Sequence, residues 1–258
     1  MSISIFNKNH GIRLSSKRER QDSQGFTIVE LLIATAVFSV IMILLTLGII
    51  QLSNAYYKGV TTTDTQNSAR NVLSAISQSI EFSGGQVGTT ISTPAAGQTY
   101  AFCVGSEAYY YQLGEEVVST PSSGQAYHGL VSVNGDPACP ILPPSNPFTP
   151  NTGYDFGSLT NGNNIPVGGQ ELLGYKMRLS KLSVTYDQGS GLYEIDVRVV
   201  YGDNDLLCNN TADPGSCATT TTMNKASDYL GDVVCRGGVG QQFCSTAELQ
   251  SSIEKRVN

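Results

Sequence analysis

The sequence contains no tryptophan, only two histidines and few charged side chains, which make up 14% of its 258 residues. Glycine and tyrosine are plentiful, as are serine, threonine and asparagine. Such a composition is common in exported β-rich domains and unusual in cytosolic enzymes. The histidines, His10 and His128, form no readable Cys/His or Ser/His/Asp set with other residues. We therefore expect a protein that is not an enzyme and that uses no cofactor or metal.

Cysteine is absent from the first 102 residues and then occurs six times, always after the long hydrophobic run. This placement is expected if the later part of the chain reaches an oxidising compartment, and it favours three disulfides. Eight residues separate the cysteines in each of the pairs 208–217 and 235–244, a spacing that suits disulfide loops and not zinc knuckles. These two pairs with 103–139 are one of several pairings that remain open. The six candidates are Cys103, Cys139, Cys208, Cys217, Cys235 and Cys244.

Positive charge is concentrated at the N-terminus. Residues 1–25 carry five basic and two acidic side chains, a net charge of +3, in a chain whose total is −6. Basic residues that flank an apolar stretch tend to stay in the cytoplasm, so we expect the N-terminus to remain inside and the later part to be translocated. That later part carries a net charge of about −9, which argues against general binding to nucleic acid phosphates.

An uncharged run of twenty residues extends from Leu31 to Ile50. At about 1.5 Å per residue, a helix of this length spans a bilayer core of roughly 30 Å. An ordinary secretory signal has a shorter apolar run, with its cleavage site beyond that run. Here the small residue Gly25 precedes the run, so cleavage after Gly25 would remove residues 1–25 as a leader and keep the apolar helix.

Glu30 is the one acidic residue inside this apolar surrounding. An unpaired carboxylate at membrane depth costs on the order of 3 kcal/mol or more, so a specific partner is expected. The alternative is that Glu30 lies at the level of the lipid headgroups. Cleavage after Gly25 would supply a partner, because the new ammonium of Phe26 on a neighbouring subunit has the opposite charge.

The stretch Gly25-Phe26-Thr27-Ile28-Val29-Glu30-Leu31-Leu32 resembles the class III signal of type IV prepilins and pseudopilins. The resemblance implies that a membrane prepilin peptidase cuts after Gly25 and methylates the amine of Phe26, and that Glu30 guides assembly. It also implies a single-pass subunit of the cytoplasmic membrane that later joins an extracellular pilus. Its partners would be the prepilin peptidase, other pilin subunits and the assembly platform. Major pilins often carry a proline about twenty residues into the mature helix, whereas this chain has none there.

The character of the chain becomes amphipathic after Ile50. Five apolar residues with helical spacing lie on one face, and 83–85 supplies a stop of one serine and two glycines. We therefore expect one helix over 26–82, with a transmembrane part at 31–50 and a second half that packs on a sheet. The apolar face consists of Ala69, Val72, Leu73, Ile76 and Ile80.

The remainder, 83–258, reads as an exported β-rich globular domain. Short strands are expected at 99–104 and 107–113, and the six prolines of 137–150 predict an irregular loop. Alternating residues at 181–187 and 192–200 predict a hairpin across 188–191. Its apolar faces would lie under the helix. The expected fold class is α+β, a long N-terminal helix packed on an antiparallel sheet domain with disulfide-closed loops. The apolar positions of the hairpin are Leu182, Val184, Tyr186, Tyr193, Ile195, Val197 and Val199.

The C-terminal region resembles the larger minor pilins of the PilW type, in YGDNDLLC at 201–208 and CRGGVGQQFC at 235–244. That resemblance implies a structural minor subunit that primes or caps a pilus used for adhesion, motility or DNA uptake. The chain length points the same way. The alternative is a type II secretion pseudopilin or a pilus-tip adhesin that binds a surface ligand.

Three smaller patterns have weaker functional readings. Asp203, Asn204 and Asp205 offer oxygens to a calcium ion, although a turn with solvated acids is the favoured reading. The segment 209–211 has the pattern of a glycosylation acceptor, which is short and common. The three tyrosines at 109–111 are interpreted as packing residues of a strand and not as a ligand platform.

Overall fold

A computed structural model describes residues 25–84, 87–90, 99–118, 128–135, 168–209, 223 and 226–256. The expected leader up to residue 24, the proline-rich loop 137–150, and two of the six cysteines, Cys139 and Cys217, lie outside these residues. The chain divides into two units, Met1–Ile49 and Ile50–Asn258, which are described separately.

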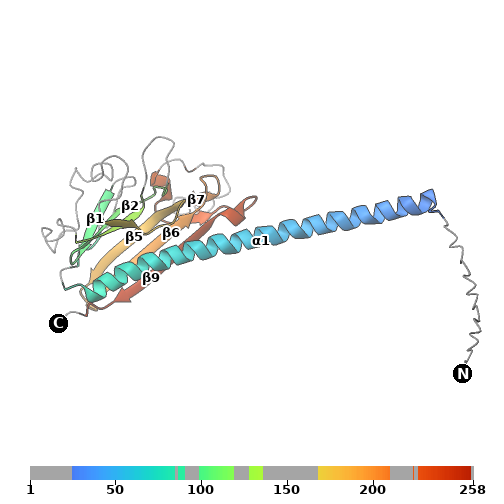
Figure 1. The fold of residues 1–258 in the computed structure, drawn as a ribbon. Coiled ribbons are helices and arrows are strands. Elements are labelled where there is room, and N and C mark those ends of the chain that lie inside the picture. The colour runs from blue at the N-terminus through green and yellow to red at the C-terminus, as the bar shows by residue number, and fades with distance from the viewer. Residues whose placement is uncertain are drawn as a thin grey trace, which may run out of the picture. The chain divides into compact units, whose positions relative to one another are not determined.

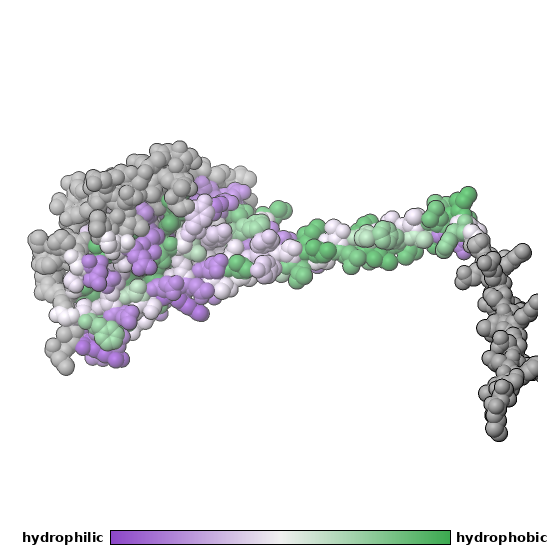
Figure 2. All heavy atoms as spheres, in the orientation of Figure 1, coloured by the Kyte–Doolittle hydropathy of each residue, from purple (hydrophilic) through white to green (hydrophobic). Residues whose placement is uncertain are grey.

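In the first unit the described residues form the beginning of α1, a helix that extends over Ile28–Phe82. The helix begins two residues later than the expected residue 26, because Thr27 caps it. Every side chain from Ile28 to Ile49 is exposed. In Figure 2 apolar side chains dominate the visible face of this part of the helix. Of the described residues, α1 alone is long and apolar enough to cross a membrane.

In the second unit α1 changes to an amphipathic helix, as the sequence predicts. Of the five residues of the expected apolar face, all are fully buried except Leu73, which is half-buried. The helix ends at Phe82, directly before the predicted stop. Figure 1 shows this half of α1 running beside β9 (Ser245–Ile253). Lys58 contacts Cys244, directly before β9, and Arg256, just after β9, contacts Glu81, so helix and strand run in the same direction.

The strands form two larger antiparallel sheets and one short ribbon. The first sheet has the order β1-β2-β3-β4, and the second has the order β5-β6-β9. Their bounds are β1 Thr99–Val104, β2 Glu107–Gln112, β3 Leu130–Asn134, β4 Gly169–Glu171, β5 Met177–Asp187 and β6 Leu192–Tyr201. The ribbon pairs β7 (Leu207–Asn209) with β8 (Val233–Cys235), and the 3-10 helices η3 and η4 cover Ala226–Tyr229 and Gln241–Phe243.

The two sheets and the helix enclose one hydrophobic core, to which α1, β1, β2, β5 and β6 contribute. Backbone hydrogen bonds join the sheets at the β5 edge. Gly114 N donates to Leu179 O at 2.9 Å and Val117 N donates to Met177 O at 2.9 Å. The expected α+β architecture, with a long helix on antiparallel strands, is therefore confirmed.

The predicted hairpin is present as β5 and β6, with β5 beginning four residues earlier than expected. The carboxylate of Asp187 accepts hydrogen bonds from Gly189 N at 3.0 Å and Ser190 N at 3.2 Å, which fixes the turn. Gly191 follows with φ +75°, a conformation that favours glycine. The apolar positions of the hairpin face the core, except that Tyr186 at its end is exposed.

All three tyrosines of β2 are buried, so both faces of this strand are covered. Tyr109 also ties the strand to α1, because its hydroxyl lies 2.7 Å from Ser79 Oγ and donates to Ala75 O at 3.3 Å. Ser79 Oγ in turn donates to the Glu107 carboxylate at 2.5 Å. Burial raises the pKa of Tyr109, which therefore stays protonated. The packing interpretation of these tyrosines agrees with this geometry.

Candidate processing and assembly site

Gly25 and Phe26 belong to no helix or strand and are followed by Thr27, directly before α1. A Cβ atom added to Gly25 would meet nothing within 4 Å, and its φ is not in the region that favours glycine. Phe26 is 86% exposed. Folding of the described residues therefore does not require glycine at position 25 or a buried ring at position 26. A requirement for these residues would come from a partner outside the chain.

Thr27 and Glu30 form a reciprocal capping box at the start of α1. Thr27 N and Thr27 Oγ1 each donate to Glu30 Oε2 at 2.9 Å, and Glu30 N donates to Thr27 Oγ1 at 3.2 Å. Thr27 O accepts the first intrahelical bond, from Leu31 N at 3.2 Å. Donors that an N-terminus leaves unpaired are thus satisfied, and the carboxylate lies at the favourable end of the helix dipole.

The sequence led us to expect a specific partner for the Glu30 carboxylate, and the capping box supplies hydrogen bonds but no cation. The carboxylate has hydrogen-bond partners in its own subunit, but among the described residues it has no ion-pair partner. The next charged residue along the chain is Lys58. The role of Thr27 was not predicted, although the T-x-x-E spacing before an apolar run is a recognisable capping signal.

The four described cysteines of the second unit are disulfide-bonded. Cys235 and Cys244 form a disulfide across a sequence separation of 9, one of the two local pairs considered above. Cys103 and Cys208 are also disulfide-bonded, and no described cysteine is free. The disulfide-closed loop expected at 235–244 is therefore present.

Two of the three residues considered for calcium, Asp203 and Asn204, have partners within the chain. Asp203 Oδ1 pairs with Lys176 Nζ at 3.3 Å, and Asn204 Oδ1 accepts from Arg178 at 2.9 Å. The Arg178 guanidinium is buried over the Tyr229 ring, with Cζ 4.2 Å from the ring centroid. Burial raises the pKa of Tyr229 to about 12. Nowhere in the described ranges do three or more His, Cys, Asp or Glu residues group in a way that could hold a metal ion.

Asn209 of the glycosylation pattern also has internal partners. Its amide donates to Asp228 O at 3.0 Å and Leu230 O at 2.8 Å, which ties β7 to η3. An amide nitrogen held in this way is not presented as a glycan acceptor. The other two residues of the pattern, at 210 and 211, lie outside the described part of the chain.

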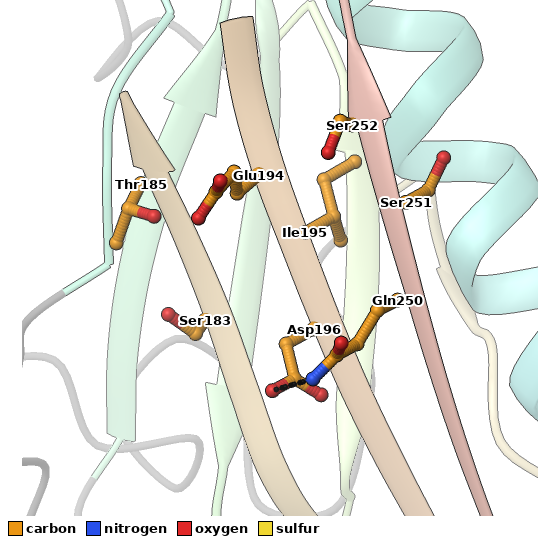
Figure 3. A pocket seen from close by; sticks show the side chains of 8 residues that line it. All are labelled: Ser183, Thr185, Glu194, Ile195, Asp196, Gln250, Ser251 and Ser252. Atoms are coloured by element: carbon orange, nitrogen blue, oxygen red, sulfur yellow. Dashed lines mark hydrogen bonds between the residues drawn. The ribbon is translucent and has the colours of Figure 1, made fainter. Parts of the chain in front are cut away.

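The outer face of β5-β6-β9 carries a polar hollow of about 330 Å³ (Figure 3). Gln250 of β9 points toward Asp196 of β6 and donates to its carboxylate at 3.1 Å. Neither His nor Cys lines the hollow, so it contains no nucleophile with an adjacent base of the Cys/His or Ser/His kind. The lining residues are Ser183, Thr185, Glu194, Ile195, Asp196, Gln250, Ser251 and Ser252.

Comparison with known families matches residues 20–46 to the prokaryotic N-terminal methylation motif. Comparisons with curated proteins and with solved structures give no match. The matched residues include Gly25, Phe26 and the capping pair, together with the first turns of the exposed apolar helix. This motif is found in structural subunits and not in enzymes, and it implies processing by prepilin peptidase and assembly with other pilins. The motif and the apolar helix together support a type IV pilin-like or pseudopilin-like subunit that is anchored in the membrane before assembly.

Proposed function

We propose that this chain is a structural minor subunit of a type IV pilus, of the PilW type. One observation carries the proposal. The matched motif includes Glu30, whose carboxylate lies at the start of a helix in which every side chain from Leu31 to Ile50 is exposed in the single chain. An apolar helix of this kind needs either lipid or other helices around it. A subunit that moves from membrane to filament meets both environments in turn.

In this proposal residues 1–25 are the cytoplasmic leader, and prepilin peptidase cuts after Gly25. The new amine of Phe26 is then methylated. Residues 31–50 span the membrane with the N-terminus inside, and 83–258 form the exported domain. Residues 25–27 lie outside the helix and the ring of Phe26 is exposed, which supports this assignment, since a peptidase needs an accessible, non-helical peptide bond.

During assembly the carboxylate of Glu30 pairs with the ammonium of Phe26 on an adjacent subunit. The capping box supports this role because it fixes the carboxylate at the helix start while leaving its charge uncompensated. In an apolar filament interior, the ammonium of Phe26 stabilises the Glu30 carboxylate only when the two subunits are in the axial register that brings the charges together. The pair would therefore select the axial position of each incoming subunit.

A minor role is favoured over a major one by the chain length and by the cysteine-bounded loop that follows the hairpin. A pseudopilin of a type II secretion system is the second candidate, because the same motif occurs there. Genes adjacent to the coding sequence distinguish the two candidates. A retraction ATPase and other minor pilins would indicate a pilus, whereas a secretion outer-membrane channel would indicate a pseudopilus.

The processing step is tested by Gly25→Leu, which should leave the precursor uncut because the larger side chain does not fit a peptidase pocket built for glycine. N-terminal sequencing of the protein purified from membranes gives the result. Gly48→Leu is the matched control, since a Cβ at either glycine meets nothing within 4 Å. A wild-type protein that still begins at Met1 while prepilin peptidase is active in the same cell would contradict the proposed function.

A further inference from the structure

Exposed apolar side chains lie on the first turns of α1 in the second unit and on the loop that contacts these turns. We call this surface the collar. Its helical part follows directly on the uncharged run, and its remaining part comes from the loop closed by the Cys235–Cys244 disulfide. All of its side chains are at least 40% exposed. The collar consists of Leu52, Tyr56, Tyr57, Val60, Val239 and Phe243.

The disulfide-closed loop is fastened to the helix at several points. Lys58 Nζ donates to Cys244 O at 2.6 Å, and Thr61 Oγ1 donates to Gln242 O at 3.0 Å. The rings of Tyr57 and Phe243 are in contact, with centroids 5.5 Å apart. The loop is thereby held against α1 at the level of residues 57–61.

Val239 is the most exposed apolar residue of the collar. It lies between Gly238 and Gly240, whose φ angles are +113° and +90°, so the backbone around it has a shape that favours glycine. Its side chain is fully exposed, and no described residue covers it. A valine placed at the tip of such a loop leaves apolar area in water unless a partner removes it.

The collar also differs in charge from the rest of the exported part. Residues 31–63 and 236–243 contain no Asp or Glu, and their only charged residues are Lys58 and Arg236. The chain after residue 25, in contrast, has a net charge of about −9. A surface that is apolar and free of acids suits a partner that is apolar with anionic groups at its boundary.

The position along the helix suggests which partner this is. Leu52 lies two residues beyond Ile50, about 3 Å along α1, and Tyr56 lies six residues beyond it, about 9 Å, with a side chain that leans back toward the N-terminus. The headgroup region adds roughly 5–8 Å on each side of a hydrocarbon core of about 30 Å. Tyrosine is enriched at this level of membranes, where its ring meets the acyl boundary and its hydroxyl meets water.

We propose that the collar binds the headgroup region of the phospholipid bilayer, so that the disulfide-closed loop rests on the membrane surface before the subunit is assembled. The proposal rests on the membrane anchor of the proposed function. The proposal goes beyond the anchor, because a membrane helix can hold the subunit in the bilayer without any contact between the loop and the membrane. Extraction into a filament would then have to detach the collar as well as the helix.

The absence of tryptophan makes a direct test available, because one introduced tryptophan is the only one in the protein. The full chain carrying Val239→Trp is reconstituted into phosphatidylethanolamine and phosphatidylglycerol vesicles with quenchers at the headgroup or at mid-chain. Ile43→Trp reports on the anchor. Phe82→Trp is the matched control for the affinity of tryptophan itself, since Phe82 is also exposed but lies at the opposite end of the amphipathic half of α1.

We expect Val239→Trp to lose most of its fluorescence to the headgroup quencher, Ile43→Trp to the mid-chain quencher, and Phe82→Trp to neither. Quenching of Ile43→Trp without quenching of Val239→Trp would overturn the collar proposal and leave the anchor intact. Failure of Ile43→Trp to be quenched would overturn both. Equal quenching of Val239→Trp and Phe82→Trp would indicate nonspecific adsorption and overturn the collar proposal. A blue shift of the Val239→Trp emission that depends on the protein-to-lipid ratio would also overturn the collar proposal, because a second copy of the chain, and not lipid, would then cover the collar.

Discussion

At the scale of single residues, Glu30 serves two physical purposes that can be separated. Its oxygen completes the capping box with Thr27, which requires an acceptor but not a charge. Its proposed pairing with the amine of Phe26 on a neighbour requires the charge. Glutamine keeps the acceptor and loses the charge, so Glu30→Gln should preserve the helix start while removing the attraction between subunits.

We therefore predict that Glu30→Gln is cleaved normally but is not incorporated into filaments. The measurement compares sheared surface filaments with membrane fractions from wild-type and variant cells, with cleavage followed in both. Thr27→Ala is the reverse control, because it removes the cap, at a cost of about 1 kcal/mol, and keeps the charge. Normal incorporation of Glu30→Gln together with failure of Thr27→Ala would show that the cap, and not the charge, directs assembly.

At the scale of elements, the second half of α1 is held by one apolar stripe and a few polar contacts. Ile76 is fully buried in the core between helix and sheets. Ser79 adds a hydrogen-bonded connection to Tyr109 and Glu107 of β2. Ala75 and Ser79 thus connect this part of α1 to β2 by hydrogen bonds.

Replacing Ile76 by Ala should lower the free energy of unfolding of the domain by about 2–5 kcal/mol, because a buried cavity is left. The same replacement at Gln78, which is exposed two residues further along the helix, should change it by no more than about 0.5 kcal/mol. Urea denaturation followed by near-ultraviolet circular dichroism measures both. Equal effects of the two substitutions would mean that this stripe does not hold the helix on the domain.

At the scale of the whole molecule, disulfides stabilise the second unit. Cys235–Cys244 closes the loop before β9, and the entropy lost by the unfolded chain predicts a stabilisation of about 2–3 kcal/mol for a loop of this length. Cys103 and Cys208 belong to further disulfides in β1 and β7.

We predict that the native protein contains three disulfides and no free thiol. Alkylation under denaturing conditions without reductant, followed by mass spectrometry, should leave all six cysteines unmodified, and prior reduction should expose all six. Detection of alkylated cysteines without reductant would contradict the prediction. Recovery of a crosslinked 235–244 peptide checks the pairing seen in the structure.

Local patterns in the sequence were sufficient for the elements that depend on neighbours along the chain. Helical spacing predicted the buried stripe of α1, and the alternation around 188–191 predicted the β5-β6 hairpin, because both periodicities arise from backbone geometry. The sequence around Gly25 likewise predicted a prepilin-type motif, since a peptidase reads a short linear segment. These features needed no knowledge of distant contacts.

Only the tertiary structure decided the features that depend on distant partners. β9 was not predicted, because its polar residues become a strand by pairing with β6 more than forty residues earlier. The sequence favoured a solvated turn over a calcium site at 203–205, and the partners that the structure shows there, Lys176 and Arg178, lie 27 and 26 positions earlier in the chain. Tyr110 is buried because β2 is covered on both faces. The spacing of apolar residues predicts which face of a helix or strand a side chain lies on. Whether that face is buried, and which charged side chain lies beside it, depends on elements that are distant in the sequence.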